Sequence, residues 1–178
     1  MTPSYTIILE TERLILRRLV LADLNDLFAL YRDPEIRRYF PEGVLTLEET
    51  LEEIEWHMNG HPEHPQLGLW ATVLKDNNQF IGRCGLLPWQ IDGQLEVEIA
   101  YLLDKAYWKQ GLATEAARAI LHYGFGQLQL SRLICLIDPA NVASQKVAER
   151  IGLTLERTVD GIDGDNLPTL IYAIGKQA

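Results

Sequence analysis

The order of predicted elements indicates an α+β fold, with a mostly antiparallel central sheet of about seven strands and about four flanking helices. Two observations carry this prediction. Apolar residues recur at helical spacing in four segments, and they alternate or run together in seven others. The order is one strand, two helices, three strands, a helix–strand–helix passage and a closing hairpin. With 178 residues, we expect a single domain over residues 1–178.

The first strand is predicted at Arg13–Leu19. Asp23 is expected to cap the next helix, because Ser, Thr, Asp and Asn favour that position. Asp33-Pro34 ends this helix. Its apolar residues, at helical spacing, are Leu24, Leu27, Phe28 and Tyr31.

Thr46-x-x-Glu49 has the form of a capping box and predicts the start of the second helix. The segment His61–Pro65 is predicted as a loop, because two prolines cannot continue a helix. The apolar residues of this second helix are Leu47, Leu51, Ile54 and Met58.

Three strands are predicted next, at Leu67–Leu74, Gln79–Leu87 and Gln94–Leu103. Asp76-Asn77-Asn78 forms the first connecting turn. Pro88–Gly93 is expected to be a loop between the second and third of these strands.

The third helix is predicted at Leu112–Leu128, where alanines allow a close approach to the sheet. Arg132–Ile137 is a short apolar run, typical of a buried central strand. Asn141 is expected to cap the fourth helix, which Gly152 ends. The closing strands are Leu153–Val159 and Leu167–Ile174, around the turn Gly161–Gly164.

The composition limits the partners. The chain is 47% hydrophobic and 23% charged, without an apolar run long enough to span a membrane. Its beginning has no signal-peptide pattern. A net charge of −9 argues against nucleic-acid binding. Cys84 and Cys135 lie far apart in strand-like runs, which suits reduced thiols in a cytoplasmic protein and gives no reason to expect a cysteine nucleophile.

The segment Lys109–Thr114 opens the third helix with small residues. A helix N-terminus has free backbone N–H groups and a partial positive charge, so this turn can hold a diphosphate. The alternative is an ordinary, tightly packed helix start. Neither Gly-x-x-x-x-Gly-Lys-Ser/Thr nor Gly-x-Gly-x-x-Gly is present in these positions, which disfavours a P-loop or a dinucleotide fold.

Two carboxylates precede this turn. Glu96 and Glu98 are two residues apart and therefore share one face of their strand. A carboxylate close to a turn that can hold a diphosphate suggests transfer chemistry on a phosphate-bearing cofactor, in which the carboxylate would act as a base. Either glutamate can be that base, and the alternative is that both are exposed charges on a hairpin.

The remaining aromatic and histidine residues carry weaker signals. His57, His61 and His64 lie close in sequence, but the prolines break their helical face and no other ligand pattern accompanies them, so we expect no metal site. Four aromatic residues are expected to serve only in packing: Trp56, Trp70, Trp89 and Tyr172.

Two motifs identify a resemblance that covers nearly the whole chain. Glu98-Ile-Ala-Tyr101 leads to Gln110-Gly-Leu-Ala-Thr-Glu-Ala116, and Asn141-Val-Ala-Ser-Gln-Lys-Val-Ala-Glu-Arg-Ile-Gly152 follows. The chain resembles GNAT-type N-acetyltransferases of the ribosomal-protein N-terminal (Rim-type) group. The resemblance implies a GNAT-like fold, acetyl-CoA as cosubstrate and direct transfer of acetyl to a primary amine. The acceptor would be a peptide or protein N-terminus or a small molecule.

The resemblance also implies cofactor contacts. The family's pyrophosphate loop, Gln/Arg-x-x-Gly-x-Gly/Ala, falls on Trp108–Ala113, and only its first position differs. The backbone amides expected to hold the diphosphate belong to Gln110, Gly111, Leu112, Ala113 and Thr114. Lys109 either adds a charge contact or is simply solvated. The main chain of Tyr101, Leu102 and Leu103 matches the strand end that pairs with the pantetheine arm, and Asn141 matches a cofactor contact.

For catalysis, the resemblance favours Glu98 over Glu96 as the base. Many relatives have a leaving-group tyrosine seven residues after the asparagine, where this chain has Ala148, and Leu136 replaces a carboxylate that some relatives use. Ser144 matches a serine proposed to support the departing thiolate, and its alternative role is helix capping.

Because Ala148 and Leu136 stand where relatives have a tyrosine and a carboxylate, a non-catalytic acyl-CoA-binding module is the competing function. The acceptor would be selected by three loops, whose sequences show no decodable pattern: 41–44, 61–66 and 88–93. We expect a monomer or a homodimer.

Overall fold

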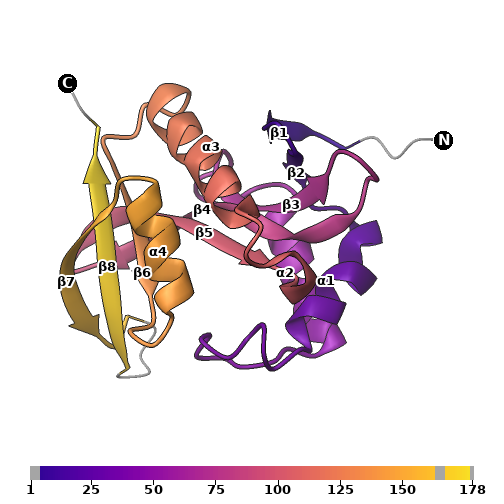
Figure 1. Ribbon diagram of the computed structural model, residues 1–178, viewed down its shortest axis with the longest axis horizontal. Helices are drawn as coiled ribbons and strands as arrows, with labels where there is room; N and C mark the ends of the chain where they lie inside the picture. The colour runs from indigo at the N-terminus through magenta and orange to yellow at the C-terminus, as the bar shows by residue number, and fades with distance from the viewer. Residues whose placement is uncertain (1–4, 163–166, 177–178) are drawn as a thin grey trace.

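A computed structural model describes residues 5–162 and 167–176. It confirms the α+β prediction: a mixed sheet with strand order β1-β2-β3-β4-β5-β6-β8-β7, in which only the described β5–β6 pair is parallel, with four α-helices (Figure 1). The strands are β1 (Ile7–Glu10), β2 (Leu14–Arg18), β3 (Gly68–Leu74), β4 (Phe80–Ile91), β5 (Gln94–Leu103), β6 (Arg132–Ile137), β7 (Thr154–Asp160) and β8 (Pro168–Gly175). The helices are α1 (Leu24–Tyr31), α2 (Leu47–His57), α3 (Leu112–Gly126) and α4 (Val142–Arg150).

The sheet has eight strands where about seven were predicted. The additional strand is β1, a four-residue edge strand that pairs with β2 through a tight turn in which Thr11 N–H donates to Leu14 O. Such a short strand, paired on one side, carries too little hydrophobic alternation to be recognised. The predicted turn Gly161–Gly164 lies partly outside the described residues.

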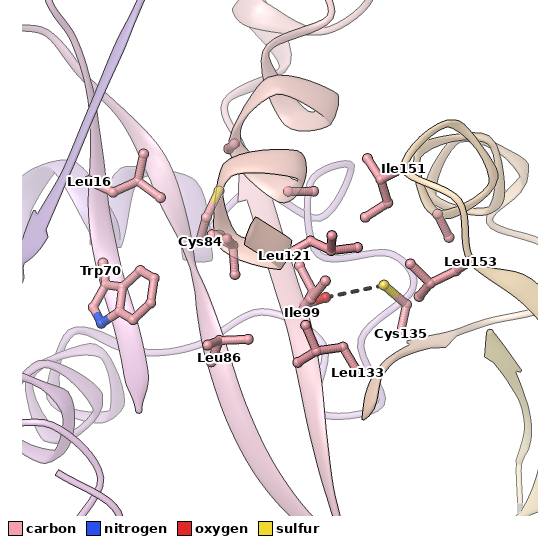
Figure 2. Close-up of a cluster of buried hydrophobic side chains, with 14 of the residues drawn as sticks. Leu16, Trp70, Cys84, Leu86, Ile99, Leu121, Leu133, Cys135, Ile151 and Leu153 are labelled. Atoms are coloured by element: carbon pink, nitrogen blue, oxygen red, sulfur yellow. Dashed lines mark hydrogen bonds between the residues drawn. The ribbon is translucent and has the colours of Figure 1, made fainter. Parts of the chain in front are cut away.

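The helices form two layers, one on each face of the sheet (Figure 1). Successive side chains of β5 point to opposite faces. Val97 and Ile99 therefore pack with α3 and α4 in one core, which Figure 2 shows around Ile99, Leu121 and Ile151. Ala100 and Leu102 pack on the other face with the cluster that contains α1 and α2 residues. Trp70 is fully buried as expected, but Trp56 is 54% exposed and is not a packing residue.

Two of the three predicted N-cap residues cap their helices with a side-chain hydrogen bond. Thr46 and Glu49 form the capping box of α2, and Asn141 Oδ1 accepts from Ser144 N–H at the start of α4. Asp23 occupies the predicted N-cap position of α1, but its side chain makes no capping hydrogen bond. Its buried carboxylate forms two hydrogen bonds of 2.7 and 2.8 Å with the Arg17 guanidinium and accepts from Val20 N–H. A charged partner from β2 binds this carboxylate more strongly than helix amides do.

The loop predicted at Pro88–Gly93 is mostly strand. β4 and β5 form one long hairpin that turns at Asp92 and Gly93, with φ of 51° and 74°. Positive φ at two successive residues matches the tight turns that suit the twist of a hairpin. Pro88 is tolerated because β3 pairs only as far as Leu86, so the edge beside Pro88 needs no N–H donor.

Cys84 and Cys135 are free and buried. No helix in the described ranges is long and apolar enough to cross a membrane.

Candidate active site

The site lies where β5 and β6 part. The register pair that joins these parallel strands is Glu98 with Ile134, and the Cys135 thiol contacts Ile99 O at 3.5 Å just beyond it (Figure 2). A cleft of about 520 Å³ opens here. It extends from the α4 N-terminus, past Glu98, to the segment after α1. Four residues predicted as site residues line it: Glu98, Tyr101, Asn141 and Ser144.

Glu98 is held by an indole. Trp89 Nε1 donates to Glu98 Oε2 at 2.7 Å, and both residues line the cleft. The expectation that Trp89 only packs was therefore wrong. The sequence does not reveal this role, because a loop at residues 88–93 would not place Trp89 beside Glu98. In the observed hairpin Trp89 is opposite Glu96 and lies diagonally next to Glu98, which is within reach of a long aromatic side chain.

Glu96 is in a different environment. Both of its carboxylate oxygens accept from Arg132 Nε, at 3.0 and 3.1 Å, and Arg132 also binds Glu156 on β7. Glu96 does not line the cleft. The two glutamates are thus separated by their partners: Glu96 joins β5 to β6 and β7, and Glu98 is the carboxylate in the cleft.

The N-terminus of α4 forms another wall. Asn141 uses its Oδ1 to cap the helix, which leaves its Nδ2 group as the donor available to a ligand. Tyr101 donates its hydroxyl proton to Ser144 O at 2.9 Å, and burial raises the pKa of Tyr101 well above its ordinary value. The Tyr101 side chain therefore ties β5 to α4, which the sequence did not reveal. Leu136 also lines the cleft, and Ala148 is completely buried.

The predicted diphosphate turn lies outside this cleft, at the start of α3. Lys109 and Gly111 have φ of 62° and 78°, and the first amide bonded back into the helix is that of Glu115, which donates to Gly111 O. The preceding amides thus belong to the open helix end. Gln110 and Gly111 are exposed and Leu112 is buried; Ala113 and Thr114 are half-buried.

Arg13 fixes this turn, and sequence reasoning missed it. Its Nη1 donates to Gln110 O at 3.1 Å, and it forms an ion pair of 2.6 Å with Glu115. An Nη2 atom lies 3.7 Å from the position that a Gly111 Cβ would occupy. The guanidinium adds positive charge beside the open amides. No local pattern could have revealed it, because the contact joins residues about a hundred positions apart.

The strand end predicted to contact pantetheine already has partners within the protein at two of its three residues. Leu103 O accepts from Trp108 Nε1 at 2.9 Å, and Leu102 pairs with Arg83 on β4. Leu102 and Leu103 are buried and do not line the cleft, whereas Tyr101 does. Of the three residues, Tyr101 is the one whose surroundings are open to a ligand in the cleft.

The cleft offers no cysteine nucleophile. Burial, and then the nearby charge of Glu98, raise the pKa of Cys135 far above its ordinary value, so its thiol stays protonated. His57 is buried as well; its Nδ1 accepts from Leu69 N–H, and burial lowers its pKa to about 4. No group of three potential metal ligands occurs within residues 5–162 and 167–176.

A sequence profile of the acetyltransferase (GNAT) domain matches residues 13–154. The chain belongs to the GNAT acetyltransferase family. This GNAT protein is 37% identical over 152 residues to the uncharacterised protein YkkB of Bacillus subtilis, covering 85% of this chain and 87% of YkkB. Its membership of this family makes it an N-acetyltransferase. Members of the family bind coenzyme A or acetyl-CoA.

Solved structures share the fold of this GNAT protein. A GNAT-family acetyltransferase from Bacillus anthracis superposes with a TM-score of 0.81 at 26% identity, covering 97% of this chain and 98% of that one. A RimL ribosomal L7/L12 α-N-protein acetyltransferase in complex with coenzyme A gives a TM-score of 0.76 at 20% identity, covering 95% and 97%. At 20% identity, the likeness to RimL shows a shared fold and no more.

Proposed function

We propose that this GNAT protein moves acetyl from acetyl-CoA directly to a primary amine, with residues 1–178 acting as one catalytic domain in the cytoplasm. The acceptor is a peptide or protein N-terminus or a small-molecule amine. One observation carries the proposal: Glu98, oriented by Trp89, lies in the cleft where β5 and β6 diverge. A carboxylate fixed there can take the proton that an ammonium group must lose before it attacks the thioester.

The roles follow from position. The amides of residues 110–114, with Arg13 beside them, hold the diphosphate. Lys109 is exposed and adds positive charge beside this diphosphate turn. Asn141 Nδ2 donates to the cofactor, and the main chain at Tyr101 borders the pantetheine arm. Alignment of the two reactants in one cleft supplies several kcal/mol of the barrier reduction.

The sequence alone also left open a binding module that does not turn over acetyl-CoA, because Ala148 and Leu136 supply no acid at the leaving sulfur; the family assignment favours the transferase. An assay of free CoA thiol across a panel of amines and peptides separates the two. We expect at least one amine to accelerate CoA release and to be recovered acetylated. Stabilisation of the protein by acetyl-CoA without acceleration by any amine would establish the binding module.

Replacing Ser144 by Ala is expected to lower kcat by up to about a hundredfold, because the hydroxyl donates a hydrogen bond to the developing thiolate. The melting temperature should not change. The α4 cap uses the backbone N–H of residue 144, which alanine also supplies. Turnover and melting are measured on one preparation. Full turnover in Ser144→Ala would assign protonation of the thiolate to water.

A further inference from the structure

Two arginines are buried in the wall of the cleft on the α1 and α2 side. Arg37 lies after α1 and is 3% exposed, and Arg83 lies on β4 and is 5% exposed. Both line the cleft. A buried guanidinium loses its hydration and needs hydrogen-bond acceptors and negative charge in return. The contacts of each arginine show how far the protein itself supplies them.

Arg83 is partly compensated. Its Nε donates to the Tyr31 hydroxyl at 2.9 Å, and that hydroxyl donates to the Glu53 carboxylate. Glu53 thus balances Arg83 through Tyr31. A guanidinium has five N–H donors, and this is the one hydrogen bond that the Arg83 side chain makes within the described residues. Arg83 lines the cleft, so the remaining N–H groups of its guanidinium can bind a ligand there.

Arg37 has a direct counterion, but one that is largely exposed to solvent. Its Nε donates to Gly43 O at 2.7 Å, and its Nη2 lies 3.2 Å from Glu42, whose side chain is 58% exposed. Solvent weakens such an ion pair. Burial, and then the positive charge of Arg83, lower the pKa of Arg37. The exposed Arg38 also lines the cleft and adds a third positive charge.

The arginines and Glu98 lie on one face of the sheet. Arg83 is opposite Leu102, and Glu98 is four residues before Leu102 on the same face of β5. Four residues of strand span about 13 Å. Between them lies Ala100, whose small side chain lines the cleft on the same face of β5. An elongated molecule can therefore reach Glu98 and the arginines together.

We propose that Arg37 and Arg83 bind an anionic group of the acceptor, so that the enzyme prefers amines carrying a carboxylate or a phosphate several bonds from the amino group. The planar guanidinium matches both anions with paired hydrogen bonds. The inference rests on the proposed function, which places the amine at Glu98.

Calorimetry with N-acetylated ω-amino acids of increasing length, and with their carboxamides, tests the anion site directly. The carboxylates should bind about tenfold to a hundredfold more tightly at the favoured length. Arg37→Gln should remove most of this preference, and Arg37→Lys should restore part of it. Arg83→Gln is a second test, and melting curves verify that each variant is folded. The matched control is Arg32→Gln, at the exposed end of α1 away from the cleft.

Equal binding of carboxylates and carboxamides by the unmodified protein, with no gain for ω-acetamidoalkyl phosphates of the same lengths, would overturn the inference. So would a preference that survives in both glutamine variants. Tighter phosphate binding would support it and assign phosphorylated amines.

The parent ω-amino acids, tested as acceptors in the CoA-release assay, separate this inference from the proposed function. Charge-selective binding without turnover of any amine would refute the transferase and leave the anion site. Turnover with equal kcat/KM for carboxylates and carboxamides would refute the anion site and leave the transferase.

Discussion

Replacing Glu98 by Gln is expected to lower kcat/KM at neutral pH by about a hundredfold or more, the usual contribution of a general base. The side chain keeps its shape but can no longer accept the proton of the ammonium group. As the pH rises toward the amine pKa of about 10, more acceptor arrives already deprotonated. The loss should therefore shrink, and kcat/KM is measured for both proteins from about pH 7 to about pH 10.

Glu96→Gln is the matched control, because it makes the same change two residues away. Glu96 binds Arg132 outside the cleft, so its replacement should weaken the contact between β5 and β6 and lower the melting temperature without removing the base. Parallel pH profiles for the Glu98→Gln variant and the unmodified protein would show that Glu98 is not the base. A larger loss in Glu96→Gln would transfer the role to Glu96.

Replacing Gly111 by Asp is expected to raise the Kd for acetyl-CoA tenfold or more. The new carboxylate would lie at the open amides of the α3 N-terminus, where it repels the diphosphate and competes for Arg13. Calorimetry with acetyl-CoA on the folded variant measures the effect.

Gly111→Ala separates charge from backbone strain. Gly111 has φ of 78°, which disfavours any side chain, but a Cβ there meets no atom closer than Arg13 Nη2 at 3.7 Å. The alanine variant should lose stability, by about 1 kcal/mol, and keep most of its affinity. If the aspartate variant binds acetyl-CoA as tightly as the alanine variant, the diphosphate is not at this turn.

Local signals predicted most of the fold. The Thr46–Glu49 box and the Asn141 cap join residues three positions apart, so the sequence displays both partners together. Asp23 carried the same kind of signal, yet its carboxylate pairs with Arg17 on β2. Capping propensity predicts the bonds of a side chain only when no stronger partner is near. In the folded chain Arg17 is such a partner for Asp23.

Much of the candidate site is built from long-range contacts, which local sequence propensities do not predict. Trp89 reaches Glu98 only in the observed β4–β5 register. Arg13 meets Gln110 and Glu115 only after the sheet has assembled. The burial of Arg37 and Arg83 likewise follows from packing α1 and α2 on the sheet. Glu98 and Gly111 could be proposed from the sequence because each lies in a short motif that the family resemblance covers.

Direct transfer of acetyl within the cleft is the central claim, and a single-turnover experiment tests it most directly. The enzyme is mixed with acetyl-labelled acetyl-CoA and an amine that the panel identifies as an acceptor, and label on protein and amine is followed beside the release of CoA thiol. The label should appear on the amine at the rate of CoA release, with none on the protein. Labelled protein that forms before the acetylated amine would contradict direct transfer, as would CoA release that the amine does not accelerate.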